Sequence, residues 1–252
     1  MNSKGQILLI TVMLLATVMT IVLSVSFKST TDTQITKLEE ESQKALAAAE
    51  SAIEVALKEN SSVTIGSGSL SSITGFEGSA TVESATAKNF TTSIIQKDGS
   101  YTFYLGDYDV QNKTITPVAD PNNLTLCFES ATPNPAIEVT LVKTASIKKY
   151  VVDPSSRITN ASAGSSCSPD TVNYSFSTTI PGADIGADGQ FLLVRVFYAP
   201  TKLFFSRNTD LPIQGRTASS EATSSTSTGV SKRIVLFQSY PQIPGEFFST
   251  SF

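Results

Sequence analysis

The sequence predicts an α+β fold, in which a long N-terminal helix precedes a mostly antiparallel β domain. Three observations lead to this prediction. The run from Ile7 to Val25 is apolar, no Gly or Pro occurs between Gln6 and Ile65, and the hydrophobic period changes after Gly66. We therefore expect three segments: a leader at residues 1–5, a helix over 6–59 and a β-rich domain over 60–252.

The first half of the expected helix has the composition of a membrane span, at about residues 7–27. A helix rises about 1.5 Å per residue, so about 20 apolar residues cross a hydrocarbon core of about 30 Å. The few Ser and Thr residues in the run can bond back to carbonyls of their own helix. The charges at Lys4 and Lys28 favour a cytoplasmic amino terminus and an external C-terminal domain. The residues expected to face lipid or neighbouring helices are Ile7, Ile10, Leu14, Leu15, Val18, Ile21 and Val22.

The second half of the helix is predicted to be amphipathic and to end near Asn60. Apolar or small residues recur at spacings of three and four, and charged residues occupy the opposite face. Much of this stripe is alanine, which allows close approach to a β domain or to neighbouring copies of the chain. Its members are Ile35, Leu38, Ser42, Ala45, Leu46, Ala49, Ala52, Ile53, Ala56 and Leu57.

After Gly66, short runs of β-branched and aromatic residues alternate with turn-forming residues, which is typical of strands. Asp98-Gly99 predicts a tight hairpin turn. We expect the segment Phe191–Tyr198 to be a central strand beside Lys232–Gln238. The run 218–231 is expected to be a long exposed hairpin tip, with an O-glycosylated or adhesive loop as the alternative. The predicted strands cover 79–84, 89–96, 101–105, 125–129, 137–143, 150–152, 172–177, 190–198, 201–206, 214–218 and 232–240.

Composition argues against several functional classes. The net charge of −4 gives no basis for nucleic-acid binding, and the absence of histidine removes the usual general base and the commonest metal ligand. No cofactor and no catalytic residue is predicted. Asp184 and Asp188 are weak calcium candidates, against the simpler interpretation of Asp-rich turns. Cys127 and Cys167 predict one disulfide if the domain is exported, and otherwise two thiols that never meet.

The Lys4-Gly5-Gln6 junction before the apolar run resembles the class III signal of type IV pilins and pilin-like proteins. The segment around Ala47-Ala48-Ala49-Glu50 looks like the N-terminal helix of PilX-like minor pilins. This resemblance implies cleavage after Gly5 by a prepilin peptidase and methylation of the new amino terminus, Gln6. Two alternatives are an uncleaved anchor and an ordinary leader cut before Phe27.

The resemblance implies a structural subunit of a type IV pilus or related filament, first held in the cytoplasmic membrane and later displayed on the cell surface. Its partners would be membrane lipid, other pilin subunits and the prepilin peptidase. Major pilins carry a glutamate at the position of Ile10, so its absence favours a minor, priming or tip pilin. The alternatives are a membrane-tethered binding or adhesin domain that never polymerises, and an exported enzyme.

Overall fold

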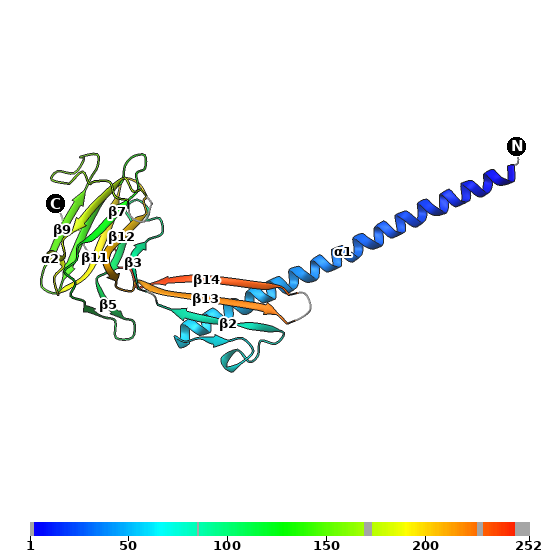
Figure 1. Cartoon of the computed structure of the whole chain (residues 1–252), viewed down its shortest axis with the longest axis horizontal. Coiled ribbons are helices and arrows are strands. Elements are labelled where there is room, and N and C mark those ends of the chain that lie inside the picture. Colours follow the sequence, from blue (N-terminus) through cyan, green and yellow to red (C-terminus); the bar gives the residue numbers. More distant parts are fainter. Residues whose placement is uncertain (1–2, 85, 169–172, 226–228, 245–252) are drawn as a thin grey trace. The chain divides into compact units, whose positions relative to one another are not determined.

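The structure is a computed structural model that describes residues 3–84, 86–168, 173–225 and 229–244, with the backbone alone for 3–9. It has the expected α+β fold, with one long helix followed by antiparallel sheets (Figure 1). The chain divides into two compact units. The first holds residues 1–82 and 218–236, and the second holds 83–217 and 237–252.

The helix α1 (Ser3–Glu59) is unbroken over 57 residues, as the absence of Gly and Pro after Gly5 predicts. It ends where expected, because Asn60 takes a left-handed conformation with φ of 50°. The N–H group of Ser61 then donates to the carbonyl of Ala56 at 3.2 Å, which caps the last turn. The end of the helix is therefore set by local backbone chemistry.

The first unit pairs the end of α1 with one sheet of order β1-β2-β13-β14. Its short strand β1 pairs antiparallel with β2, placing Val63 opposite Ala80. The strands are β1 (Val63–Thr64), β2 (Phe76–Glu83), β13 (Gly215–Ser224) and β14 (Ser231–Ser239), with the 3-10 turn η1 (Gly68–Leu70) after β1.

The second unit holds two four-stranded sheets, β10-β7-β12-β3 and β4-β11-β8-β9, and the hairpin β5-β6. Phe103 on β4 stacks against Phe205 on β12 with 4.0 Å between ring centroids, so the two sheets share one core. Its elements are β3 (Ala87–Thr91), β4 (Ser100–Tyr104), β5 (Gly106–Asp109), β6 (Thr114–Pro117), β7 (Leu124–Phe128), β8 (Ala136–Lys143), β9 (Ile147–Val152), β10 (Phe176–Ile180), α2 (Gly182–Ile185), β11 (Gly189–Phe197) and β12 (Leu203–Leu211).

Several strand predictions were correct in place but wrong in pairing. Asp98-Gly99 does form a turn, but it joins β3 and β4, which belong to different sheets. The strand β11 is central as expected, yet its neighbours are β4 and β8, not β14. Local sequence marks turns and strands, whereas the choice of partner depends on contacts between distant segments.

The predicted exposed tip at 218–231 was wrong over its first half. β13 continues to Ser224, and the side chains of Ala218, Ser220, Ala222 and Ser224 are buried. The run had suggested a loop because it is rich in Ser and Thr. From Ala218 on, buried positions alternate with less buried ones, which is the pattern of a strand with one covered face. Small residues are what that face requires.

Candidate functional site

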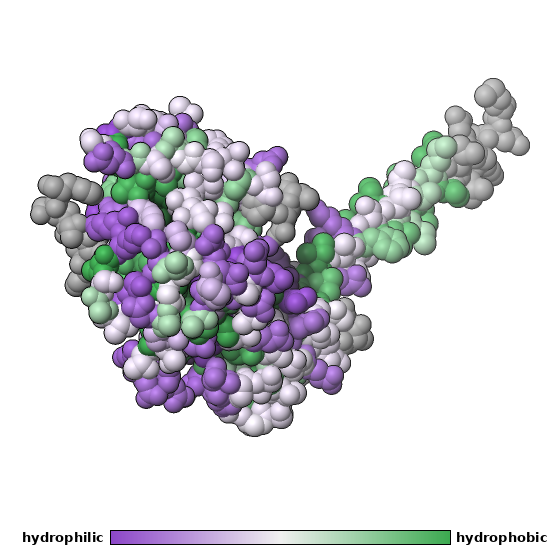
Figure 2. Space-filling model, turned by 60° about the vertical axis from the view of Figure 1, so that its left-hand side comes forward, coloured by the Kyte–Doolittle hydropathy of each residue, from purple (hydrophilic) through white to green (hydrophobic). Residues whose placement is uncertain are grey.

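The N-terminal part of α1 is an apolar surface that the rest of the described chain leaves uncovered. Ile10, Leu14 and Val18 are 56%, 62% and 51% exposed, and Leu15, Ile21 and Val22 are equally uncovered. Apolar residues, green in Figure 2, cover much of the coloured part of the helix that is visible in this view. Its apolar window has a mean hydropathy of 2.3, so this helix is long and apolar enough to cross a membrane. Gly5, Gln6 and Ile7 lie in the helix, but their side chains are outside the described part.

Threonine hydroxyls along α1 find acceptors inside the helix itself. Thr17 donates to the carbonyl of Leu14 at 2.8 Å, and Thr20 reaches the carbonyl of Ala16 at 3.0 Å. A hydroxyl without a partner is costly in hydrocarbon, and these bonds remove that cost. The same bond to the fourth preceding carbonyl recurs at Thr30, Thr31, Thr33 and Thr36.

The predicted amphipathic stripe is covered only from Ala45 onward. Ile35 and Leu38 are 54% and 43% exposed, so the stripe before Ala45 contacts no other part of the described chain extensively. Leu46 was wrongly assigned to the covered stripe, because its side chain is 40% exposed. On the polar face, Lys44 pairs with Glu40 at 2.6 Å, as their spacing of four predicts. The side chains that α1 buries lie in its last four turns.

These last turns of α1 pack against the sheet of the first unit through small residues on both sides. Ala49, Ala52 and Ala56 are fully buried, and they share one cluster with Ala80 of β2 and Ala222 of β13. Facing alanines let a helix and a sheet approach closely, and each buried methyl group adds van der Waals contacts that stabilise this short distance. The sequence did not indicate Ala48, which is also buried in this cluster.

Close packing also extends to the two central strands of this sheet. Gly78 on β2 has a φ of 151°, and a Cβ there would lie within 1.9 Å of the carbonyl oxygen of Glu221. Next to it, the hydroxyls of Thr81 and Ser219 are 3.0 Å apart. Only glycine permits this approach of β2 and β13. The helix therefore rests on a sheet whose own strands are tightly joined.

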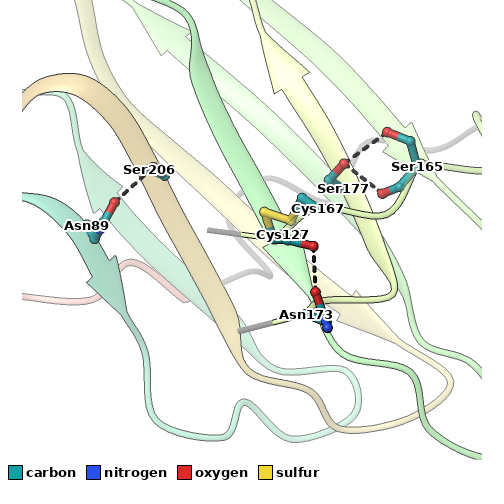
Figure 3. The surroundings of a disulfide bond; sticks show 8 residues. Asn89, Cys127, Ser165, Cys167, Asn173, Ser177 and Ser206 are labelled. Carbon is teal, nitrogen blue, oxygen red and sulfur yellow. Dashed lines mark hydrogen bonds between the residues drawn. A yellow bond between two sulfur atoms is a disulfide. The ribbon is translucent and has the colours of Figure 1, made fainter. Parts of the chain in front are cut away.

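Cys127 and Cys167 form the predicted disulfide in the second unit (Figure 3). Cys127 lies on β7 and is fully buried, while Cys167 pairs through its backbone with Tyr174. The disulfide holds Cys167 and its backbone partner Tyr174 close to β7. Beside it, Ser177 donates a hydrogen bond to the carbonyl of Ser165 at 2.7 Å. The cysteines are structural in this arrangement.

The weak calcium candidates Asp184 and Asp188 are each engaged by a lysine. Asp184 pairs with Lys148 at 2.6 Å and accepts a hydrogen bond from Tyr150, and Asp188 pairs with Lys143 at 2.9 Å. The hydrogen bonds from Lys148 and Tyr150 lower the pKa of Asp184. Among the described residues, no three His, Cys, Asp or Glu side chains gather as metal ligands. These contacts fit structural ion pairs, of which one holds α2 to β9 and the other holds the turn after α2 to β8.

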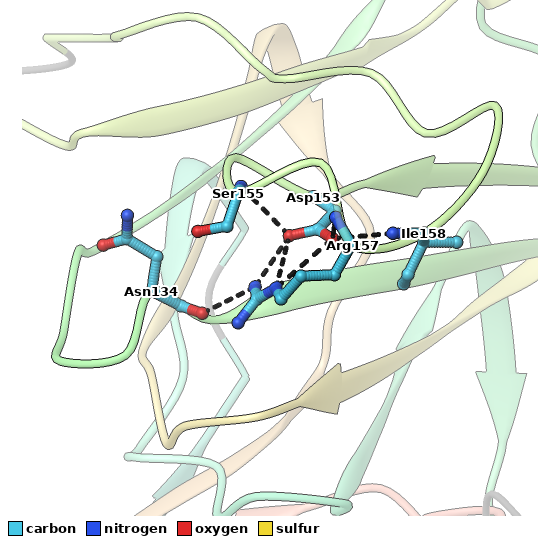
Figure 4. A network of polar contacts seen from close by, with 5 residues as sticks. All are labelled: Asn134, Asp153, Ser155, Arg157 and Ile158. Atoms are coloured by element: carbon cyan, nitrogen blue, oxygen red, sulfur yellow. Dashed lines mark hydrogen bonds and ion pairs between the residues drawn. The ribbon is translucent and has the colours of Figure 1, made fainter.

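Asp153 anchors a loop that sequence reasoning did not identify (Figure 4). Its carboxylate accepts hydrogen bonds from the backbone N–H groups of Ser155 and Ile158 and from the guanidinium of Arg157. Burial opposes ionisation of this carboxyl group, but the donors outweigh it and lower the pKa of Asp153. Arg157 also lies over the ring of Tyr198, 3.7 Å from its centroid.

Comparisons of the chain with protein-family models, with curated proteins and with solved structures find no match. The function of this chain must therefore be inferred from its own residues. The feature that stands out among the described residues is the long helix, apolar and uncovered at one end and packed on a sheet at the other.

Proposed function

We propose that the chain is a structural subunit of a type IV pilus or related filament, in a minor, priming or tip position. The observation that carries the proposal is one unbroken helix, Ser3–Glu59, with two different surroundings along its length. Its first half exposes apolar side chains all round, and its last turns are fixed to a sheet. A subunit that is first held in lipid and later packed into a filament needs both parts.

The energetics of such a transfer support the proposal. Each exposed Ile, Leu or Val side chain on α1 is worth about 1.5–3 kcal/mol when it is removed from water. Leaving the membrane is therefore tolerable only if the helix is buried again against other apolar helices. Thr17 and Thr20 already have their hydrogen-bond partners inside the helix, so the change of surroundings leaves neither of these two hydroxyls unpaired.

The resemblance at the amino terminus adds the processing step. Under this proposal a prepilin peptidase cuts after Gly5, Gln6 becomes the methylated amino terminus, and the β-rich domain lies outside the cytoplasmic membrane. Ile10 occupies the position where the major subunit carries a glutamate, which supports a specialised place in the filament. Its apolar side chain is 56% exposed and suits contact with lipid or with another helix.

The decisive experiment is mass spectrometry of fibres sheared from cells that express the chain. We expect the chain in the fibre fraction with an amino terminus at Gln6. A Gly5→Val variant should keep its leader and stay with the membrane, whereas a matched Ser3→Ala variant should behave as the wild type. A chain that retains Met1 and stays out of fibres would instead indicate a membrane-tethered binding domain. An amino terminus at Phe27 would indicate a secreted domain and refute the proposal.

A further inference from the structure

The outer edge of β14 is an open strand edge. Within the described residues, β14 is the last strand of its sheet and pairs only with β13. The bonds from Ser224 N–H to Val230 C=O and from Tyr240 N–H to Gln214 C=O show that even-numbered residues of β14 bond to β13. The odd-numbered residues of β14 therefore direct their N–H and C=O groups away from the sheet.

Another edge strand of the chain is covered, which makes the open edge of β14 notable. On β4, the side-chain amide of Gln214 accepts from the N–H of Tyr104 at 2.9 Å and donates to its carbonyl at 2.8 Å. Gln242 accepts from the N–H of Thr102 at 2.7 Å. These two glutamines take the place of a neighbouring strand. In the described part of the chain, no group outside β13 hydrogen-bonds to the backbone of β14 in this way.

The open edge is also apolar. Val235, Leu236 and Phe237 are 59%, 45% and 48% exposed, and the only charges on the strand, Lys232 and Arg233, lie near its beginning. Proteins usually protect an exposed edge with central charges, proline or a bulge, because a bare edge pairs with other strands. The middle of β14 has no such protection.

We propose that a second copy of this chain pairs with β14 in antiparallel orientation, centred on Val235. The sequence of β14 is self-complementary about this centre. Val235 would face the partner's Val235, Arg233 would face the partner's Phe237, and Lys232 would face the partner's Gln238, so no like charges are opposed. Arg233, Val235 and Phe237 are the odd-numbered residues with outward backbone groups, so this register forms about six new backbone hydrogen bonds.

The pairing has a fixed geometry with respect to α1. A two-fold axis perpendicular to the sheet reverses the direction of β14 in the second copy. β14 runs in the same direction as α1 within the first unit (Figure 1), so the apolar helices of the two copies point in opposite directions. Ile234 packs with the cluster beneath α1, whereas Val235 lies on the other face of the sheet, so the helix does not cover the new contact. Two copies paired in this way therefore cannot both insert α1 into the same membrane from the same side.

Disulfide trapping tests the register in the full chain purified in detergent. Under mild oxidation, Val235→Cys should cross-link to itself, and an equal mixture of Arg233→Cys and Phe237→Cys chains should cross-link to each other. Arg233→Cys alone should give little cross-link, because its own counterpart is then about four residues away along the partner strand. Efficient self-linking at 233, or none at 235, would overturn the proposed register.

A second measurement tests whether the edge drives association. Light scattering during gel filtration should show a dimer of the full chain whose dissociation constant rises at least about tenfold for Val235→Pro. The N–H of residue 235 faces outward, so proline there leaves the β13–β14 pairing intact. Val235→Thr, which keeps the N–H and the β-branched shape, should dimerise as the wild type does. A wild type that stays monomeric at about 100 µM, or a dimer unaffected by proline, would overturn the proposal.

Discussion

Enlarging one alanine beneath α1 should loosen the first unit. Ala52 is fully buried among Ala80 and Ala222, so Ala52→Leu adds three carbon atoms where no space exists. Overpacking of this kind costs about 1–3 kcal/mol. A cost of about 2 kcal/mol corresponds to an opening equilibrium about 30-fold more favourable.

Hydrogen exchange of the full chain in detergent measures this opening directly. Amides in the last turns of α1 and in β13 should exchange about 30-fold faster in Ala52→Leu than in the wild type. The matched control is Ala47→Leu, which adds the same atoms at an exposed position of the same helix and should leave exchange unchanged. Equal exchange in both variants would refute the tight helix–sheet contact.

Four further predictions concern single features. Ser220→Ala should raise the free energy of unfolding by about 1 kcal/mol in denaturant titrations, because the buried Ser220 hydroxyl finds no hydrogen-bond partner among the described residues. Gly78→Ala should destabilise the first unit by about 3 kcal/mol or more in the same assay, since its Cβ would overlap backbone. Removing the Cys127–Cys167 disulfide, which spans 40 residues, should cost about 4 kcal/mol, and reduction of the wild type should reproduce the loss. Because the pKa of Asp153 is lowered in the folded chain, its carboxylate stabilises the fold at pH above its unfolded pKa of about 3.9. This contribution is lost as the pH falls through the pKa in the folded chain. Asp153→Asn should therefore abolish this part of the acid-induced loss of stability.

The sequence predicts what depends on neighbouring residues along the chain. The helix, its end at Asn60 and most strands follow from local patterns of three, four and two residues. Pairing between distant strands does not follow from such patterns, so the prediction of which strands lie beside β11 was wrong. The run from Ala218 to Ser224 shows the same limit, because its small residues form a buried face only in the folded chain, where Ala222 joins the alanines of α1.

The candidate site was foreseen to a similar extent. The apolar part of α1 and the cysteine pair are visible in the sequence by composition. The Asp153 loop and the open edge of β14 are not, because each is defined by backbone groups that only the folded chain brings together or leaves bare.

The uncovered middle of α1 sets the distance between its apolar segment and the first sheet. From Lys28 to Lys44 the helix has no buried side chain, and 17 residues correspond to about 25 Å of rise. Lipid headgroups on one side of a bilayer occupy only about 5–8 Å beyond the hydrocarbon. A chain inserted up to Lys28 would hold its first sheet clear of the headgroups. Other proteins would then have room to contact the uncovered part of α1 between the headgroups and the sheet.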